Sequence, residues 1–376
     1  MDIRIIKNAT WMMSEKTISI VGLFLVTSYV AKYIGPEIFG IIALATATFQ
    51  IIQIIAQLGN DNIIFKRVSK KRESGVKLIK STFTIRTIIY IILSLPTLYY
   101  FYSYKNNIAF IFSITICITC YLSSIDIYSI YNNAILKSKI NTLANIAGLS
   151  IGLSLQYLIV YFKLNPVILS IPIIATTFIP LCIRFLLFSK NNKVKIKTKN
   201  ILRYNKYILI SGLSIVFSTL SIAIYTRVNQ FMISYLDGDY NLGIYSVAVT
   251  LATSWSFILS ALINSTLPTI FGEKDNFKSL LITANLNLIV ITISLIVLFL
   301  VYFFGDFFVY FLFGKAYEKA NNVLFILCIS TMISSLGMVS TRFIIRYSGY
   351  SFLSKKMSIM VIFSILFCAT KSGHFS

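Results

Sequence analysis

The chain has 376 residues, of which 57% are hydrophobic and only 12% charged, and its mean hydropathy is +0.81. Soluble globular proteins carry about twice that charged fraction, so the composition excludes an ordinary soluble domain and indicates a protein embedded in lipid. The net charge of +22, from 34 Lys and Arg against 12 Asp and Glu, has too little polar surface around it to indicate nucleic-acid binding.

Charge-poor runs long enough to cross a bilayer divide most of the chain. About 20 apolar residues cross a hydrocarbon core of roughly 30 Å, and lipid leaves the backbone of an isolated span no partner except its own helix. The sequence therefore predicts an all-α, polytopic membrane protein with about 11 transmembrane helices. The predicted spans are 12–34, 38–58, 83–104, 107–130, 142–162, 165–188, 208–236, 242–266, 279–304, 320–341 and 357–370.

Basic residues are distributed unevenly between the connections of these predicted spans. Most of them lie in the N-terminal leader and after the even-numbered spans. The connections after odd-numbered spans hold only Lys105, Lys163, Lys315 and Lys319, with Lys32 at the edge of the first span. The positive-inside rule therefore predicts a cytoplasmic N-terminus and cytoplasmic even-numbered connections. Topology explains the high net charge, and no nucleic-acid partner is implied.

The chain also divides into two similar halves. The stretch Tyr33-Ile-Gly-Pro-Glu-Ile-Phe-Gly40 runs parallel to Tyr235-Leu-Asp-Gly-Asp-Tyr-Asn-Leu-Gly243, with one inserted residue. We predict an N-terminal six-helix bundle at 1–188, a basic cytoplasmic linker at 189–207, and an incomplete C-terminal bundle of about five helices at 208–376. Two repeated bundles around a central cavity are the layout of a transporter, with the substrate path between the halves.

Several kinds of site are disfavoured by the same sequence. All five cysteines fall in apolar runs and the only histidine is His374, so we expect no disulfide, no metal site and no cofactor. No connection is long enough to form a soluble catalytic domain, and we find no Ser/His/Asp set and no paired carboxylates spaced for acid/base chemistry. An enzyme is therefore not expected.

Arg227 is the clearest candidate for a functional residue. An ionisable side chain inside a span costs about 2.5 to 3.5 kcal/mol, so each one is a candidate for a substrate path. Arg227 lies about 20 residues into the span that begins near 208, too deep to reach water easily on its own side. Asn229 and Gln230 follow it and make the region polar.

Four further ionisable residues complete the predicted substrate path, and all lie nearer to span ends. They are Glu15, Lys16, Arg86 and Asp126. For the first three the alternative interpretation is an interfacial position, and for Asp126 it is an ion pair with a basic loop residue. The cations Lys16, Arg86 and Arg227 outnumber the acids, which predicts a cavity of positive potential. Such a cavity suits an anionic substrate, because phosphate oxygens match a guanidinium group.

Motifs along most of the chain resemble those of one protein family. In the first half these are Trp11-x-x-x-Glu15-Lys16, Gly22, Ala31-Lys-Tyr-Ile-Gly35-Pro36-Glu37-x-Phe39-Gly40, Leu58-Gly59 and Arg67. In the second half these are Arg227-Val-Asn-Gln, Gly243-Ile-Tyr245-Ser-x-Ala248 and Leu312-Phe-Gly314-Lys-x-Tyr317-x-x-Ala320. Together they resemble Wzx-type O-antigen flippases, a branch of the superfamily that also contains multidrug/toxin extruders. Physically, Gly35 and Pro36 suit a sharp turn between the first two spans, while Gly40 and its counterpart Gly243 suit close helix packing.

The resemblance implies a fold like that of the multidrug/toxin extruders and a function in lipopolysaccharide biosynthesis. Its members move undecaprenyl-diphosphate-linked oligosaccharide across the bacterial inner membrane by alternating access. The substrate-path role then carries over to Arg227 and its neighbours, and a polysaccharide polymerase and a chain-length regulator become candidate partners. Family members commonly have an acid where this chain has Asn229, and usually twelve spans, so the resemblance also indicates a truncated C-terminal bundle.

Two alternatives stay open at the level of sequence. A multidrug/toxin exporter would share the fold but favour cationic substrates, for which the chain lacks a buried acidic cluster. A membrane-embedded assembly partner without transport activity would share the composition. The genes beside this one would separate the first alternative from a flippase.

Overall fold

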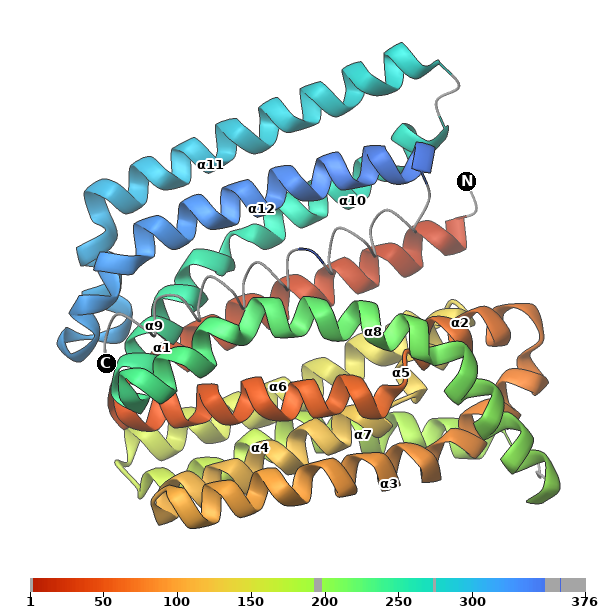
Figure 1. Cartoon of the computed structure of the whole chain (residues 1–376), viewed down its shortest axis with the longest axis horizontal. Helices are drawn as coiled ribbons and strands as arrows, with labels where there is room; N and C mark the ends of the chain where they lie inside the picture. Colours follow the sequence, from red (N-terminus) through yellow and green to blue (C-terminus); the bar gives the residue numbers. More distant parts are fainter. Residues whose placement is uncertain (1–2, 193–197, 273–274, 349–358, 360–376) are drawn as a thin grey trace. The chain divides into compact units, whose positions relative to one another are not determined.

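Helices form all the regular structure of the residues described in this computed structural model, which are 3–192, 198–272, 275–348 and 359 (Figure 1). The described helices divide between two compact units. Unit 1 contains Met1–Ile34 and Ile41–Arg227, and unit 2 contains Gly35–Gly40 and Val228–Ser376. The predicted bundle boundaries at 188 and 208 stay predictions.

Unit 1 is built from the first seven α-helices and the first part of the eighth. Their bounds are α1 Ile3–Gln57, α2 Asn60–Lys70, α3 Arg72–Tyr104, α4 Asn107–Ile125, α5 Tyr128–Ala134, α6 Ser138–Tyr161, α7 Ser170–Asn191 and α8 Thr198–Leu236, with a short 3-10 helix η1 at Pro166–Leu169.

The helix α1 consists of two helical segments that meet at Gly35. Gly35 has φ of 77° and ψ of 171°, a conformation outside the helical region that glycine adopts without steric cost. Pro36 follows and starts the second segment, where its missing N–H needs no partner. The chain therefore turns between the first two predicted spans at Gly35.

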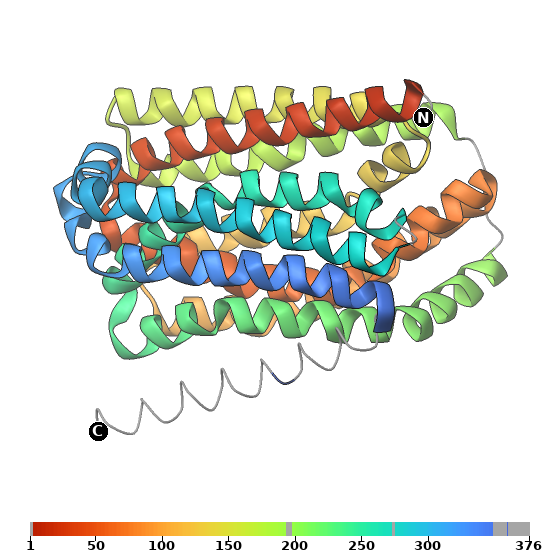
Figure 2. The same ribbon diagram turned by 90° about the horizontal axis from the view of Figure 1, so that it is seen from above.

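Close helix packing organises the rest of unit 1. The first segment of α1 lies beside α6 (Figure 2). There the rings of Tyr29 and Tyr157 stack with their centroids 5.4 Å apart, and the Tyr33 hydroxyl donates to the Leu164 carbonyl. Gly148 and Gly152, one helical turn apart on α6, lie directly against α7, because small residues let two helices approach. The amphipathic helix α2 buries its apolar side against α3 and α5.

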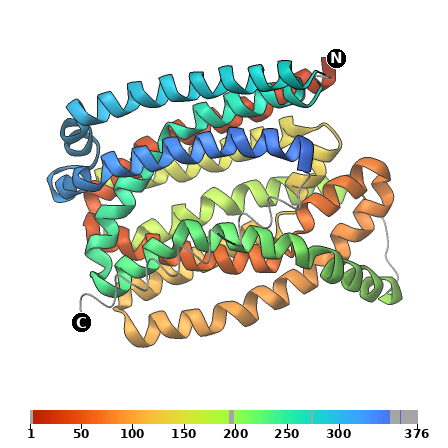
Figure 3. The same ribbon diagram turned by 45° about the horizontal axis from the view of Figure 1, so that its top comes forward.

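Unit 2 contains the end of α8 and four further α-helices. Their bounds are α9 Gly238–Ser254, α10 Ser256–Gly272, α11 Asn276–Phe313 and α12 Asn321–Ser348, with a 3-10 helix η2 at Lys315–Ala320. The long helix α11 runs beside α12 and α10 (Figure 3), around a core that includes Trp255, Leu259 and Val290. The predicted span 242–266 is interrupted at Trp255, between α9 and α10.

The outer faces of the helices are apolar, as expected for lipid contact. On α11 the side chains of Phe299, Phe303 and Phe307 are 60%, 61% and 60% exposed. Eight helices of the described residues are long and apolar enough to cross a membrane, or nine if the pair Tyr204–Leu213 and Ile215–Leu236, bent by 46°, is one span. The all-helical, multi-pass membrane fold is thereby confirmed.

The predicted count of about 11 spans stays a prediction. One of the eight helices, Phe24–Gln57, includes the turn at Gly35 and so covers parts of the first two predicted spans. The eleventh predicted span, 357–370, lies outside the described residues except for position 359.

Candidate functional site

Three arginines lie well inside long apolar helices of unit 1. They are Arg86 on α3, Arg184 on α7 and Arg227 on α8. A guanidinium group in a span must pair with another polar group or face water, because hydrocarbon has no hydrogen-bond acceptor and no counter-charge for it. The partners of each arginine therefore show what it can do.

Arg86 is enclosed by protein and caps the end of α4. Its side chain is 1% exposed, and Nη1 donates to the Ser124 carbonyl at 2.8 Å. That carbonyl belongs to the last turn of α4, where the backbone acceptors lack partners within the helix and the dipole favours a cation. Nη2 also pairs with Oδ1 of Asp61 at 3.4 Å. In this arrangement Arg86 is held by partners within unit 1.

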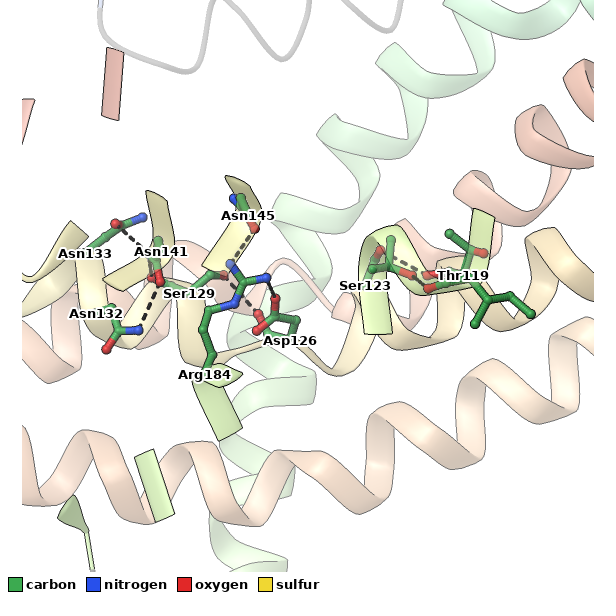
Figure 4. A network of polar contacts seen from close by, with 11 residues as sticks. Thr119, Ser123, Asp126, Ser129, Asn132, Asn133, Asn141, Asn145 and Arg184 are labelled. Carbon is green, nitrogen blue, oxygen red and sulfur yellow. Dashed lines mark hydrogen bonds and ion pairs between the residues drawn. The ribbon is translucent and has the colours of Figure 1, made fainter. Parts of the chain in front are cut away.

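Asp126, the residue directly after α4, is held by the second arginine. Oδ2 of Asp126 lies 2.5 Å from Nη2 of Arg184, and the two side chains are only 13% and 6% exposed. Arg184 also donates from Nη1 to Oδ1 of Asn145 on α6 at 2.7 Å (Figure 4). A buried pair of this kind is tolerated only where further hydrogen bonds complete it. Asp126 thus ties the end of α4 to α6 and α7.

A chain of amide side chains extends this network through α5 into the start of α6. Asn132 donates to Oδ1 of Asn141 at 2.9 Å, and Asn141 donates in turn to Oδ1 of Asn133 and to the Ser129 carbonyl, both at 2.8 Å (Figure 4). The Ser129 hydroxyl donates to the Asp126 carbonyl at 3.0 Å. Oδ1 of Asp126 and Nε of Arg184 are buried without a hydrogen-bond partner among the described residues, while the other contacts of the network hold α4, α5, α6 and α7 together. We call this region the α4–α5 corner.

Arg227 has a different environment from the other two. Its side chain is half-buried, and its guanidinium donates to Oε1 of Gln50, on the second segment of α1. Among the described residues no carboxylate forms an ion pair with Arg227. The neutral amide of Gln50 leaves the positive charge uncompensated.

The two residues predicted to line the path with Arg227 lie on different sides of α8. Gln230 follows Arg227 by three residues and shares its face, whereas Asn229 is turned away by about 200° and is exposed. Glu15 and Lys16 belong to α1, but their side chains lie outside what the structure describes. Of the predicted path, the structure gives partners within unit 1 to Arg86, Asp126 and Arg227.

The two motif glycines lie against each other's helices within unit 2. A Cβ atom on Gly40 would overlap the carbonyl oxygen of Asp239, and one on Gly243 would overlap the carbonyl oxygen of Pro36. Pro36 and Asp239 each precede the corresponding glycine by four residues, so the contact is reciprocal, like that between equal partners around a twofold axis. The repeated sequence motifs thus meet in space, and only glycine fits at both positions.

Sequence reasoning missed three of the partners that define these sites. Gln50, Asp61 and Asn145 were not among the predicted residues, although each is a polar residue in or beside an apolar run. A search for amides in spans would have found Gln50. Among the described residues no group of three or more His, Cys, Asp or Glu side chains could hold a metal ion.

Comparisons with known proteins agree with this fold. No curated protein matches the sequence. The structure resembles an outward-facing multidrug resistance MATE family transporter of the MOP superfamily, with 15% identity, a TM-score of 0.51, and 95% of each chain covered. It also resembles the eukaryotic MATE transporter AtDTX14, with 12% identity, a TM-score of 0.52, and 97% and 96% of the two chains covered.

The sequence itself matches a family across most of its length. The family described as "Polysaccharide biosynthesis protein" matches residues 5–274, which is well over half of the chain. The fold shared with MATE transporters covers the rest as well. This chain therefore belongs to the polysaccharide biosynthesis protein family.

Proposed function

We propose that this chain is a flippase that moves undecaprenyl-diphosphate-linked saccharide, the repeat unit of O-antigen, across the bacterial inner membrane by alternating access. Membership of a polysaccharide biosynthesis family and the fold of a membrane transporter support this proposal. A saccharide on a lipid diphosphate is too polar to cross hydrocarbon unaided, so it needs a passage lined by protein.

The observation that carries the proposal is the position of Arg227 in an apolar helix and the neutral charge of its hydrogen-bond partner. Its guanidinium lies in a membrane-spanning segment, half-buried, with the neutral Gln50 as its partner. A phosphate group that replaces the Gln50 oxygen gains the full charge of the cation, because none of the carboxylates that the structure describes has to be displaced first. The same charge repels a cationic drug, which argues against the alternative of multidrug export.

The orientation of the chain is part of this proposal. The concentration of basic residues in the leader and after even-numbered spans supports a cytoplasmic N-terminus. The saccharide would then be accepted at the cytoplasmic face, where lipid-linked units are assembled, and released outside. A polysaccharide polymerase and a chain-length regulator are the candidate partners that would use the released units.

The direct test is transport by the purified protein in liposomes. Undecaprenyl diphosphate carrying a labelled oligosaccharide is placed in one leaflet, and its appearance in the other is measured by accessibility to an added glycosidase. We expect transport by the wild type, its loss in Arg227→Ala, and partial retention in Arg227→Lys. Lys66→Ala, which removes an exposed charge on α2, is the matched control and should transport normally.

Two results would contradict parts of the proposal. The first is full transport by Arg227→Ala at wild-type protein levels, which would remove the role given to Arg227 and leave the flippase function standing. The second is an unchanged amount of surface polysaccharide in a strain that lacks this gene. Transport of a cationic dye in the absence of any saccharide transport would favour multidrug export instead, and no transport of either would favour an assembly partner.

A further inference from the structure

Four polar side chains form a stripe along the second segment of α1. Thr46, Gln50, Gln53 and Gln57 follow one another at intervals of four, three and four residues, which places them within about 60° of one another around the helix. All four are half-buried. We call them the amide stripe. With a rise of 1.5 Å per residue, the stripe runs about 16 Å inward from the end of α1 at Gln57.

A neighbouring face of the same segment is packed into unit 1. Ala45, Phe49 and Ala56 are fully buried there. The Phe49 ring stacks on that of Phe101 on α3, with the two ring centroids 6.4 Å apart. This packing fixes the rotation of the segment about its own axis, because Phe49 and Ala56 are seven residues apart and lie on one side. The amide stripe is therefore held in one direction by the core of unit 1.

The stripe has more hydrogen-bonding capacity than unit 1 uses. The Thr46 hydroxyl donates to the Ile42 carbonyl at 2.7 Å, and Gln50 accepts from Arg227. Gln53 and Gln57 form no side-chain hydrogen bond with any residue that the structure describes, and neither amide is sealed inside the protein. Their donors and acceptors are thus available at the surface of unit 1.

Hydrocarbon is an unsuitable environment for this stripe. An amide without partners costs several kcal/mol in the core of a bilayer. Gln57 alone is explained by its place at the end of the helix, close to the membrane surface. Gln53 and Gln50 lie one and two turns deeper, so an interfacial position does not account for them. The stripe must therefore face water or a polar ligand along its length.

The chemistry of the stripe matches one part of the substrate better than the other. Amides both donate and accept hydrogen bonds and carry no charge, as do the hydroxyl groups of a sugar. Arg227, bonded to the stripe at Gln50, supplies a charge at its inner part. A cation followed by a row of neutral amides suits a ligand in which an anionic group is joined to a hydroxyl-rich chain.

We propose that the amide stripe binds the saccharide of the lipid-linked substrate through its hydroxyl groups, while Arg227 binds the diphosphate. The inference rests on the proposed function, which it deepens by assigning the recognition of sugar to Gln53 and Gln57. Substrates that share the diphosphate but differ in saccharide are distinguished at these two residues.

The test compares two probes bound to the full-length protein in detergent. One is a short-chain polyprenyl diphosphate, and the other is the same lipid carrying a neutral trisaccharide. We expect the wild type to bind the glycosylated probe more tightly. The double variant Gln53→Leu/Gln57→Leu should lose about tenfold or more in affinity for the glycosylated probe, through two lost hydrogen-bonding groups, and bind the bare lipid unchanged.

Thr48 provides the matched control, because its hydroxyl also donates to a carbonyl one turn back, Leu44 at 2.8 Å, but lies about 200° around the helix from Thr46. Thr48→Val should bind both probes as the wild type does. If the double leucine variant does not fold, judged by its elution in size-exclusion chromatography, Gln53→Met and Gln57→Met take its place.

The outcomes separate this inference from the proposed function. Wild-type affinity of the glutamine variants for the glycosylated probe overturns the role of the stripe and leaves the flippase proposal intact. An equal loss for both probes also overturns it, since the stripe would then act on the lipid diphosphate. If the wild type binds neither probe, both the proposed function and this inference fail.

Discussion

Arg86, Arg184 and Arg227 lie in two regions of unit 1 that differ in the charge of their partners. At the α4–α5 corner, Arg86 and Arg184 are buried and pair with Asp61 and Asp126. On α8, Arg227 is half-buried and pairs with the neutral Gln50. In the first region the charges are matched and the hydrogen bonds join helices to one another. In the second region, none of the described carboxylates pairs with Arg227, so its positive charge is available to an anionic ligand.

The difference shows that an arginine in a membrane span has two uses that its sequence position does not distinguish. A buried pair with a carboxylate adds rigidity but offers a ligand nothing, because a new anion would have to displace the old one. An arginine bonded to an amide can exchange that neutral partner for an anion at the loss of one hydrogen bond. Four predictions test whether the two regions divide in this way.

The largest effect is expected from Asp126→Ala at the α4–α5 corner. It leaves Arg184 buried without its carboxylate, which typically costs about 3 to 5 kcal/mol of the free energy of unfolding. The measurement is thermal unfolding of the purified protein in detergent. Glu73→Ala is the control, because its ion pair with Lys77, at 3.1 Å, joins side chains that are 64% and 34% exposed, and such a pair contributes about 1 kcal/mol or less.

A double variant makes this first prediction stricter. Asp126→Leu/Arg184→Leu removes both charges and should be more stable than Asp126→Ala alone, since no unpaired charge is left inside the protein. If Asp126→Ala unfolds at the wild-type temperature, the corner does not have the structural role described here.

The second prediction concerns Arg227→Gln on α8. We expect transport of the lipid-linked saccharide to fall about ten- to a hundredfold, the loss of one charge-assisted hydrogen bond to phosphate. The unfolding temperature should change little, since the partner that the structure gives Arg227 is the neutral amide of Gln50. Loss of the folded protein, as in Asp126→Ala, would place Arg227 in the same class as the corner and remove the contrast.

Much of the fold could be predicted from sequence because hydropathy alone decides which segments lie in lipid. The helical, multi-pass architecture followed from apolar runs of about 20 residues. The depth of Arg227 in the membrane stays a prediction, which rests on counting residues along a single helix and needs no tertiary structure. The number of spans does not follow as securely, because Phe24–Gln57 reads as one long helix while its chain turns at Gly35.

The partners of the arginines could not be predicted in the same way. Gln50 and Arg227 are 177 residues apart in the chain. The sequence around either residue does not indicate that the two are in contact. Asp126 was predicted to line a path, whereas its contact with Arg184 depends on how α4 packs against α7. The packing of the helices decides whether a charged side chain in a span pairs with a neighbouring residue or stays available to a ligand.

The third prediction exchanges arginine for lysine in both regions. At the corner, Arg86→Lys keeps the charge but cannot reach both Ser124 and Asp61, so we expect a loss of about 1.5 kcal/mol in stability from the broken hydrogen bond. On α8, Arg227→Lys should leave stability unchanged and reduce transport only in part. Unfolding temperatures and transport rates of the two variants, measured side by side, decide this. Equal losses of stability would contradict the distinction.

The smallest effect is expected from Gln50→Glu, which gives Arg227 the carboxylate partner that the corner arginines already have. The new ion pair is only half-buried and is therefore worth about 1 kcal/mol. A phosphate group now has to compete with this carboxylate, so affinity for a polyprenyl diphosphate should fall about fivefold while the protein becomes slightly more stable. Gln50→Asn, which keeps a neutral amide, is the control. Equal or tighter binding of the diphosphate by Gln50→Glu would show that its phosphate groups do not bind at Arg227, and the contrast between the two regions would lose its functional meaning.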